Sequence, residues 1–190
     1  MRNSTGLAAV TMAIAVLAGC SKKSDQPVNQ TPTTLPDPAN LSEQTKAEKS
    51  PSQAFADAMA AGDTFEIESS RLAEKNSASA SVKKFAAAMI KAHTDSTAKL
   101  NEAAAKAVPP IVPKPILTGD QQQMLDALKD KQGAEFNSAY VEAQRKAHQM
   151  TLDLLKNYSA AGDTPPLKSL AASLVPIVTG HLNMANGLKS

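Results

Sequence analysis

Residues 82–107 read VKKFAAAMIKAHTDSTAKLNEAAAKA, and this stretch indicates the fold class. Its apolar residues recur every three or four positions, which is the period of one face of an α-helix. They are Val82, Phe85, Ala86, Met89, Leu100 and Ala104. Ser79 stands where an N-cap residue would start the helix. The next stretch, VPPIVPKPILTGD (108–120), places four prolines within seven positions, and prolines cannot continue a helix.

The same spacing predicts three more long helices, at about 52–75, from 133 to about 158 and at 167–188, and a short one at about 120–131. In AAGDTPP (160–166), Gly162 should end one helix, Thr164 should cap the next and Pro165 should lie in its first turn. Pro176 should lie on the outer face of the last helix and bend it. Together these features predict an all-α fold, an antiparallel four-helix bundle with a short extra helix in the crossover. The proline-rich segment should cross the end of this bundle.

The composition supports helices and argues against some partners. The chain of 190 residues has no Trp, two Tyr and four Phe, so its core consists of small and aliphatic side chains. Such a core favours close-packed helices over a β-sandwich. The net charge is +2, and no basic stripe with interleaved aromatic residues is present, so we expect no nucleic-acid partner.

The first 20 residues are typical of a secreted protein. Arg2 precedes an apolar stretch of signal-peptide length, and the sequence Leu-Ala-Gly-Cys at 17–20 resembles the lipobox of bacterial lipoproteins. Cys20 is the only cysteine, which excludes an internal disulfide and makes it the candidate lipid anchor. The alternative is a plain secretory signal with a chance cysteine. Ser21 follows, where Asp would resemble an inner-membrane retention signal, so an outer-membrane anchor is favoured.

These features divide the chain into three parts. Residues 1–19 are a lipoprotein signal peptide, residues 20–50 hold the acylated cysteine and a disordered tether poor in apolar residues, and residues 51–190 form the bundle. The expected location is the bacterial cell envelope, with the membrane-anchored protein on the outer membrane facing the periplasm. The membrane is then a partner through acylated Cys20, and an envelope partner protein is not identified.

Several polar residues lie on the faces that the helices must bury. On a helical wheel Glu66 and His93 fall near the middle of the apolar arcs of the first two long helices, and His181 lies within that of the last. His148 lies toward one edge of a broad arc, on a line with Tyr140 and Gln144. All three histidines and one glutamate therefore face the interior at comparable heights. Methionines 59, 89, 150 and 184 also fall on or beside inner faces, as core filler.

Two hypotheses account for the inward polar residues. In the first they form a structural network of hydrogen bonds, for example from Glu66 to His93 and from Gln144 or Tyr140 to His148. In the second, His93, His148, His181 and Glu66 bind one transition-metal ion, since nitrogen and oxygen ligands suit Zn, Cu, Fe or Ni. The sequence leaves both open, so no cofactor is certain and a mononuclear transition metal is the candidate.

Four segments resemble a known family. They are GDTFEIESSRLA (62–73), VKKFAAAMIKAH (82–93), FNSAYVEAQRKAH (136–148) and LKSLAASLVPIVTGHL (167–182), and they are similar to the helices of the family called domain of unknown function 4142. The resemblance implies a ferritin-like bundle in a bacterial envelope protein. Seven positions match the family pattern: Glu66, His93, Tyr140, Gln144, His148, Pro176 and His181. Ala92 departs from it, because the family usually has Asp there.

Neither motifs nor the resemblance indicate an enzyme, and no catalytic residue is assigned. A ferritin-like di-iron site needs Glu-x-x-His pairs, but Ile90, Arg145 and Val178 stand at the corresponding positions. Nucleophile-elbow, phosphate-loop and zinc-protease motifs are also missing. The leading interpretation is a lipid-anchored, periplasm-facing bundle with a non-enzymatic binding or stress-protective role. The alternative is a periplasmic Cu, Zn or Fe binding protein that uses the inward histidines and Glu66.

Overall fold

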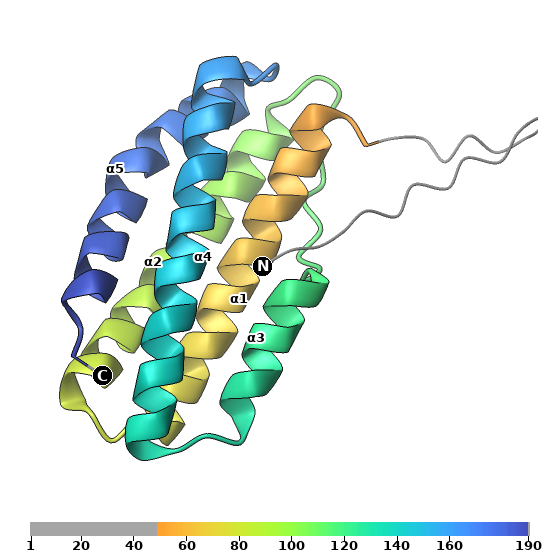
Figure 1. Ribbon diagram of the computed structural model, residues 1–190. Helices are drawn as coiled ribbons and strands as arrows, with labels where there is room; N and C mark the ends of the chain where they lie inside the picture. The colour runs from red at the N-terminus through yellow and green to blue at the C-terminus, as the bar shows by residue number, and fades with distance from the viewer. Residues whose placement is uncertain (1–48, 190) are drawn as a thin grey trace, which may run out of the picture. The chain divides into compact units, whose positions relative to one another are not determined.

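The computed structural model describes residues 49–189, and these contain five helices and no strand. The helices are α1 (Pro51–Asn76), α2 (Ala80–Ala105), α3 (Gly119–Lys129), α4 (Gly133–Ala161) and α5 (Pro165–Gly187). Four of them form a bundle and α3 lies on its outside (Figure 1), which confirms the predicted fold. The predicted signal peptide, Cys20 and nearly all of the tether lie outside the described residues. No helix within 49–189 has both the length and the apolar character needed to cross a membrane.

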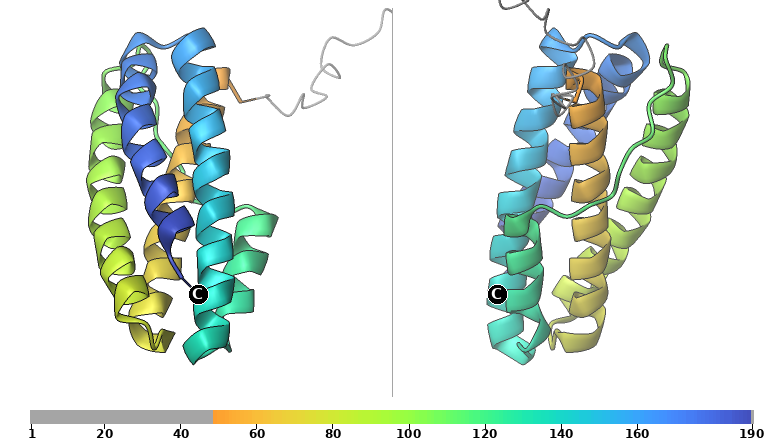
Figure 2. Two further views of the ribbon diagram at one scale, coloured as in Figure 1. Left: turned by 60° about the vertical axis from the view of Figure 1, so that its left-hand side comes forward. Right: turned by 90° about the vertical axis from the view of Figure 1, so that its right-hand side faces the viewer.

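Neighbouring helices in the bundle run in opposite directions. Helix α1 packs against α2 and α4, and α5 packs against α4 and α2, so that α1 and α5 lie on opposite corners (Figure 2). The short helix α3 lies in the outer groove between α1 and α4. Every long helix therefore offers one stripe of side chains to a shared interior.

Local chemistry sets the helix ends close to where the sequence places them. Ser79 caps α2, and its hydroxyl accepts a hydrogen bond from the Val82 amide at 3.4 Å. Gly162 ends α4, and a Cβ at this position would lie 2.5 Å from a carbonyl oxygen of the last turn. Thr164 occupies the N-cap position of α5, but its side chain makes no capping hydrogen bond and contacts Asp163 instead. Pro176 is exposed, as predicted for the outer face of α5.

The proline-rich crossover takes a different path from the predicted one. It does not simply cross the end of the bundle but runs along the outer side of α1 to reach α3 (Figure 2, right). Two polar side chains of α1 hold it there. The Gln53 amide donates to the Val112 carbonyl at 2.8 Å, and the Lys114 amide donates to Asp57 Oδ1 at 2.9 Å. These contacts satisfy backbone groups of a segment that forms no secondary structure of its own.

The interior has two apolar clusters with a polar layer between them. One cluster includes Phe55, Leu100, Leu155 and Leu174, and the other includes Phe65, Phe85, Phe136 and Tyr140. The switch from one cluster to the other falls in the middle of each long helix, where the inward polar residues stand. The methionine prediction is half right, because Met59 and Met89 are buried whereas Met150 and Met184 are about half exposed.

Candidate metal centre

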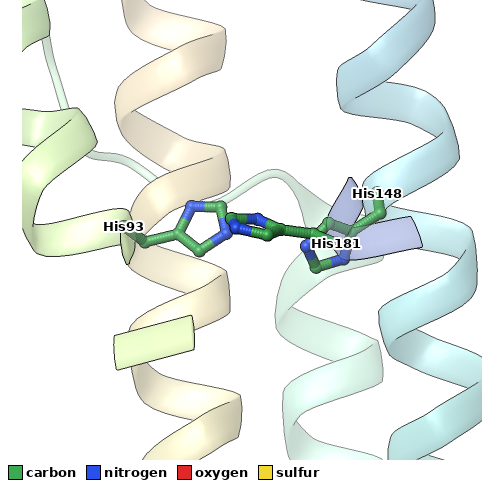
Figure 3. Close-up of side chains that lie close together, drawn as sticks. All are labelled: His93, His148 and His181. Carbon is green, nitrogen blue, oxygen red and sulfur yellow. The ribbon is translucent and has the colours of Figure 1, made fainter. Parts of the chain in front are cut away.

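Three histidines meet in the middle of the bundle. His93 comes from α2, His148 from α4 and His181 from α5, and their rings turn toward one another (Figure 3). The ring centroids are 5.5–5.7 Å apart, and one ring nitrogen from each histidine lies within 4.8 Å of the other two. The structure therefore brings together all three histidines that the helical wheels placed inside.

Two of the histidines are held by hydrogen bonds at Nδ1. His148 Nδ1 donates to the Gln144 carbonyl one turn earlier at 2.8 Å, so a neutral His148 carries its lone pair on Nε2. His93 Nδ1 donates to Asp63 Oδ1, also at 2.8 Å. The other carboxylate oxygen of Asp63 accepts from the Thr97 hydroxyl at 3.1 Å. A carboxylate or carbonyl behind the ring is the usual support of a metal-binding histidine.

One ring nitrogen of each histidine is buried without a partner. These atoms are His93 Nε2, His148 Nε2 and His181 Nδ1, and none has a hydrogen-bond partner among the described residues. Buried polar atoms are nearly always paired, and an unpaired one costs about 1–3 kcal/mol. Three such atoms facing a common centre are what a metal ion or another bound species would satisfy. This observation favours the metal hypothesis over a closed hydrogen-bond network.

The electrostatics leave two of the histidines neutral. Burial, assisted by the charge of His93, lowers the pKa of His148 to about 3 and that of His181 to about 4. Burial also acts to lower the pKa of His93, but the hydrogen bond to Asp63 and the charges of Glu66 and Asp63 outweigh it, so that this pKa is raised. Because a histidine binds a metal ion as the neutral imidazole, His148 and His181 are in the ligand form at neutral pH.

Glu66 lies beside the triad rather than within it. It is only 2% exposed, neither carboxylate oxygen has a hydrogen-bond partner among the described residues, and Oε1 lies 3.4 Å from His148 Nδ1. That nitrogen is on the opposite side of the ring from the free Nε2 atom. Burial raises the pKa of Glu66 to about 7, against the lowering effect of the charge on His93.

Tyr140 and Gln144 are fully buried near the site but bond to helix α1. The Tyr140 hydroxyl and the Ser70 hydroxyl share a hydrogen bond of 2.8 Å, and the Gln144 amide donates to the Ser69 hydroxyl at 3.1 Å. Neither side chain makes the hydrogen bond to His148 that the network hypothesis suggested; only the Gln144 carbonyl does. These two residues therefore hold α4 against α1 and leave the three histidines to face the centre.

Asp63 is a site residue that sequence reasoning missed. It is 2% exposed and takes the place that the network hypothesis gave to Glu66, as the partner of His93. A signal was present, because Asp63 lies three residues before Glu66 and the two therefore share one face of α1.

Comparison with known proteins adds a family and a fold. The profile of the family described as "Domain of unknown function (DUF4142)" matches residues 37–188, which is most of the chain. No curated protein matches the sequence. Among solved structures, CopM in the Cu(II)-bound form matches with a TM-score of 0.60 at 17% identity, over 71% of this chain and 93% of that chain. CopM in the Cu(I)-bound form gives 0.59 at 16% identity, over 73% and 94%. At such identity the likeness establishes the shared helical fold.

Proposed function

We propose that this chain, which belongs to the family of domain of unknown function 4142, binds a single transition-metal ion through His93, His148 and His181. The observation that carries the proposal is the meeting of three histidines whose ring nitrogens come within 4.8 Å of one another, with one buried, unpartnered nitrogen on each ring. Small ring movements would bring them to the metal–nitrogen distance of about 2.0–2.1 Å. We propose a binding role in the cell envelope, with no enzymatic activity.

Copper is the first candidate ion and zinc the second. Imidazole nitrogens are suitable ligands for both ions. Magnesium and calcium bind through oxygen ligands instead, so three nitrogens do not favour them. The bundles that resemble this chain in fold are described as copper-bound in both oxidation states, which supports testing copper first. Met89 is buried in the cluster next to the histidine layer, whereas the exposed Met150 and Met184 are outside it.

The carboxylates take supporting roles in this proposal. Asp63 holds His93 from behind and fixes which nitrogen faces the centre. Glu66 supplies negative charge from the far side of His148 rather than a ligand atom, which changes the role that the sequence suggested for it. His93 would bind as the neutral imidazole, with Nδ1–H donating to Asp63 and Nε2 free for the ion.

The first test is elemental analysis of the untagged protein, followed by thermal melting with and without Cu, Zn, Fe and Ni. We expect about one ion per chain. At a hundredfold excess over the dissociation constant, binding adds about 2.7 kcal/mol of stability, which for a chain of this size raises Tm by about 5–10 °C. The rise should vanish in His181→Ala, the mildest of the three changes because His181 is only partly buried.

The control is Gln149→Ala, which changes an exposed residue next to His148 and should keep both the metal and the rise in Tm. A protein without bound metal and without any rise in Tm would refute the proposal. The triad would then be a polar layer of the core.

A further inference from the structure

A cavity of about 160 Å³ lies beside the histidine triad, between α2 and α5. Two of the three histidines, His93 and His181, form part of its wall, together with Ser96 and Lys99 on α2 and Ile177 on α5. His181 is partly exposed, whereas His148 and His93 are only 1% and 5% exposed. The α4 histidine is thus away from the cavity, and the α2 and α5 histidines border it.

A second cavity on the opposite side of the bundle does not reach the free nitrogens. It has a volume of about 250 Å³ and lies among α1, α4 and the start of α3, with Glu66 and Met150 in its wall. None of the three histidines lines it. Glu66 meets His148 at Nδ1, which is already bonded to the Gln144 carbonyl, so this cavity leads to the back of that ligand.

The rim of the α2–α5 cavity carries one acidic residue, Asp95, and one basic residue, Lys99. Asp95, one of its lining residues, forms an ion pair with Lys91 at 2.6 Å. Lys99 is exposed on the same rim, and no carboxylate within residues 49–189 forms an ion pair with it. The inner wall of the cavity includes His93 and His181, whose imidazole rings carry no negative charge. A cation held there by neutral ligands would attract an anion to its free side.

We propose that the α2–α5 cavity is the entrance of the metal site and accommodates a small anionic ligand at the coordination position that the chain leaves open. Three protein ligands with one open position are the pattern of sites that exchange ligands, whereas structural sites are closed by four. The inference rests on the proposed function, since it assumes that the triad binds a metal. It adds that the ion is exchangeable and that a small anion, not a fourth side chain, completes its coordination.

The experiment blocks one cavity at a time in the full chain. Ile177 is 41% exposed on the rim, so Ile177→Trp should fill the α2–α5 cavity without disturbing the core. Met150 is 53% exposed in the wall of the other cavity, so Met150→Trp is the matched control. Asp95→Trp is a second block of the α2–α5 cavity from the α2 side. Metal-free melting curves show which variants are folded.

Cu(II) loading and its removal by EDTA are followed by stopped-flow absorbance, and azide is then titrated into each copper-loaded protein as the anionic probe. We expect Ile177→Trp to slow both loading and removal at least about tenfold while the dissociation constant for Cu(II) changes less than about threefold. Azide should give a ligand-to-metal charge-transfer band in the wild type and in Met150→Trp. The band should be lost or need at least about tenfold more azide in Ile177→Trp and Asp95→Trp, and Lys99→Gln should weaken azide binding at unchanged copper affinity.

Each result is decisive. If the wild type binds copper but exchanges it equally fast in Ile177→Trp, Asp95→Trp and Met150→Trp, the entrance lies elsewhere and the inference fails. Slower exchange in Met150→Trp alone would place the entrance at the Glu66 cavity and overturn the inference too. A copper-loaded wild type without an azide band would refute the open position. Absence of copper binding in every protein would instead overturn the inference for copper, and the proposed function would fail with it if Zn, Fe and Ni also gave no bound metal and no rise in Tm.

Discussion

Asp63 and Glu66 are buried carboxylates one helical turn apart on α1, and they differ in how their charge is compensated. Asp63 accepts hydrogen bonds from His93 and Thr97. The Gln144 amide, which donates to Ser69, lies close enough to Glu66 to lower its pKa in part, but burial dominates and raises that pKa to about 7. A buried carboxylate is costly to ionise in the metal-free protein, and a cation bound nearby would offset that cost. The two residues should therefore respond in opposite ways to loss of charge.

Glu66→Gln should stabilise the metal-free protein and weaken metal binding. The difference between a pKa of 4.5 and one of about 7 corresponds to about 3 kcal/mol of stability that is lost when Glu66 ionises. At pH 8 the neutral amide should recover about 2 kcal/mol of this in a urea titration. Copper affinity should fall about tenfold, as expected for a residue that supports a ligand.

Asp63→Asn is the contrasting variant and should weaken both properties. It removes the carboxylate oxygen that accepts the hydrogen bond from His93 Nδ1, which costs about 1.5–3 kcal/mol in the metal-free protein, and with it the support behind His93. If Glu66→Gln lowered metal-free stability at pH 8 as Asp63→Asn does, the assignment of Glu66 as an uncompensated charge would be wrong.

The sequence is enough to predict which polar residues face the interior, but not which of them contact each other. Helical wheels place His93, His148 and His181 inside because burial follows the 3.6-residue period. Which carboxylate meets which histidine depends on the vertical offset between α1 and α2. An error of one helical turn, about 5.4 Å, exchanges Glu66 for Asp63 as the partner of His93.

At the scale of the helices, the ends of the helices can be predicted from the local sequence, whereas the path of the crossover from α2 to α3 cannot. The four prolines within residues 109–115 mark the end of α2, and Gly162 marks the end of α4. The structure agrees with both. The route from α2 to α3 depends instead on Asp57, whose carboxylate accepts a hydrogen bond from the Lys114 amide, 57 residues later in the chain. No local pattern encodes a contact at that separation, so the predicted path across the bundle end was wrong.

Asp57→Ala should loosen the crossover without disturbing the bundle. Besides the Lys114 amide, Asp57 accepts from the side chains of Lys49 and Gln53, at 2.6 and 2.7 Å. Loss of such bonds to a charged group costs about 1.5–3 kcal/mol. Hydrogen exchange should show faster exchange of the Lys114 amide and of helix α3, with the centres of α1 and α4 unchanged.

The control is Glu102→Ala, which removes an exposed carboxylate that pairs with Lys106 within α2. Solvent screens such an exposed pair, so it contributes little and exchange in the crossover should stay as in the wild type. If Asp57→Ala left the Lys114 amide as protected as before, the hydrogen bond from α1 would not be what holds the segment.

At the scale of the whole molecule, a polar layer separates two apolar clusters, and this division makes the core sensitive to pH. The layer contains ionisable groups from all four bundle helices, each with a different response to burial. His148 and His181 have folded-state pKa values below their unfolded value, so the unfolded chain binds their protons first. Glu66 has a folded-state pKa above its unfolded value, so the folded chain binds that proton first.

These shifts predict that the metal-free protein loses stability as the pH falls from 6.5 to 4.5. In this window His148 and His181 each favour the unfolded state, because their pKa values fall from 6.5 to about 3 and about 4 on folding. Glu66 acts in the opposite direction between pH 7 and 4.5, and the contribution of His93, whose pKa is raised, is already complete below pH 6.5. On balance the unfolded chain binds one proton more than the folded chain in this window. Because His181 is partly solvated, the net loss of stability should be on the order of 1 kcal/mol per pH unit.

Urea titrations of the metal-free wild type and of Glu66→Gln across pH 4.5–7.5 test this balance. The variant lacks the opposing group, so its stability should fall about twice as steeply below pH 6.5 although it starts higher at pH 7.5. The two curves should therefore converge toward acid pH. Parallel curves would show that Glu66 does not take up a proton on folding, and a flat wild-type curve would show that His148 and His181 are not held neutral. Either result would remove the physical reason for regarding the polar layer as a site prepared for a cation.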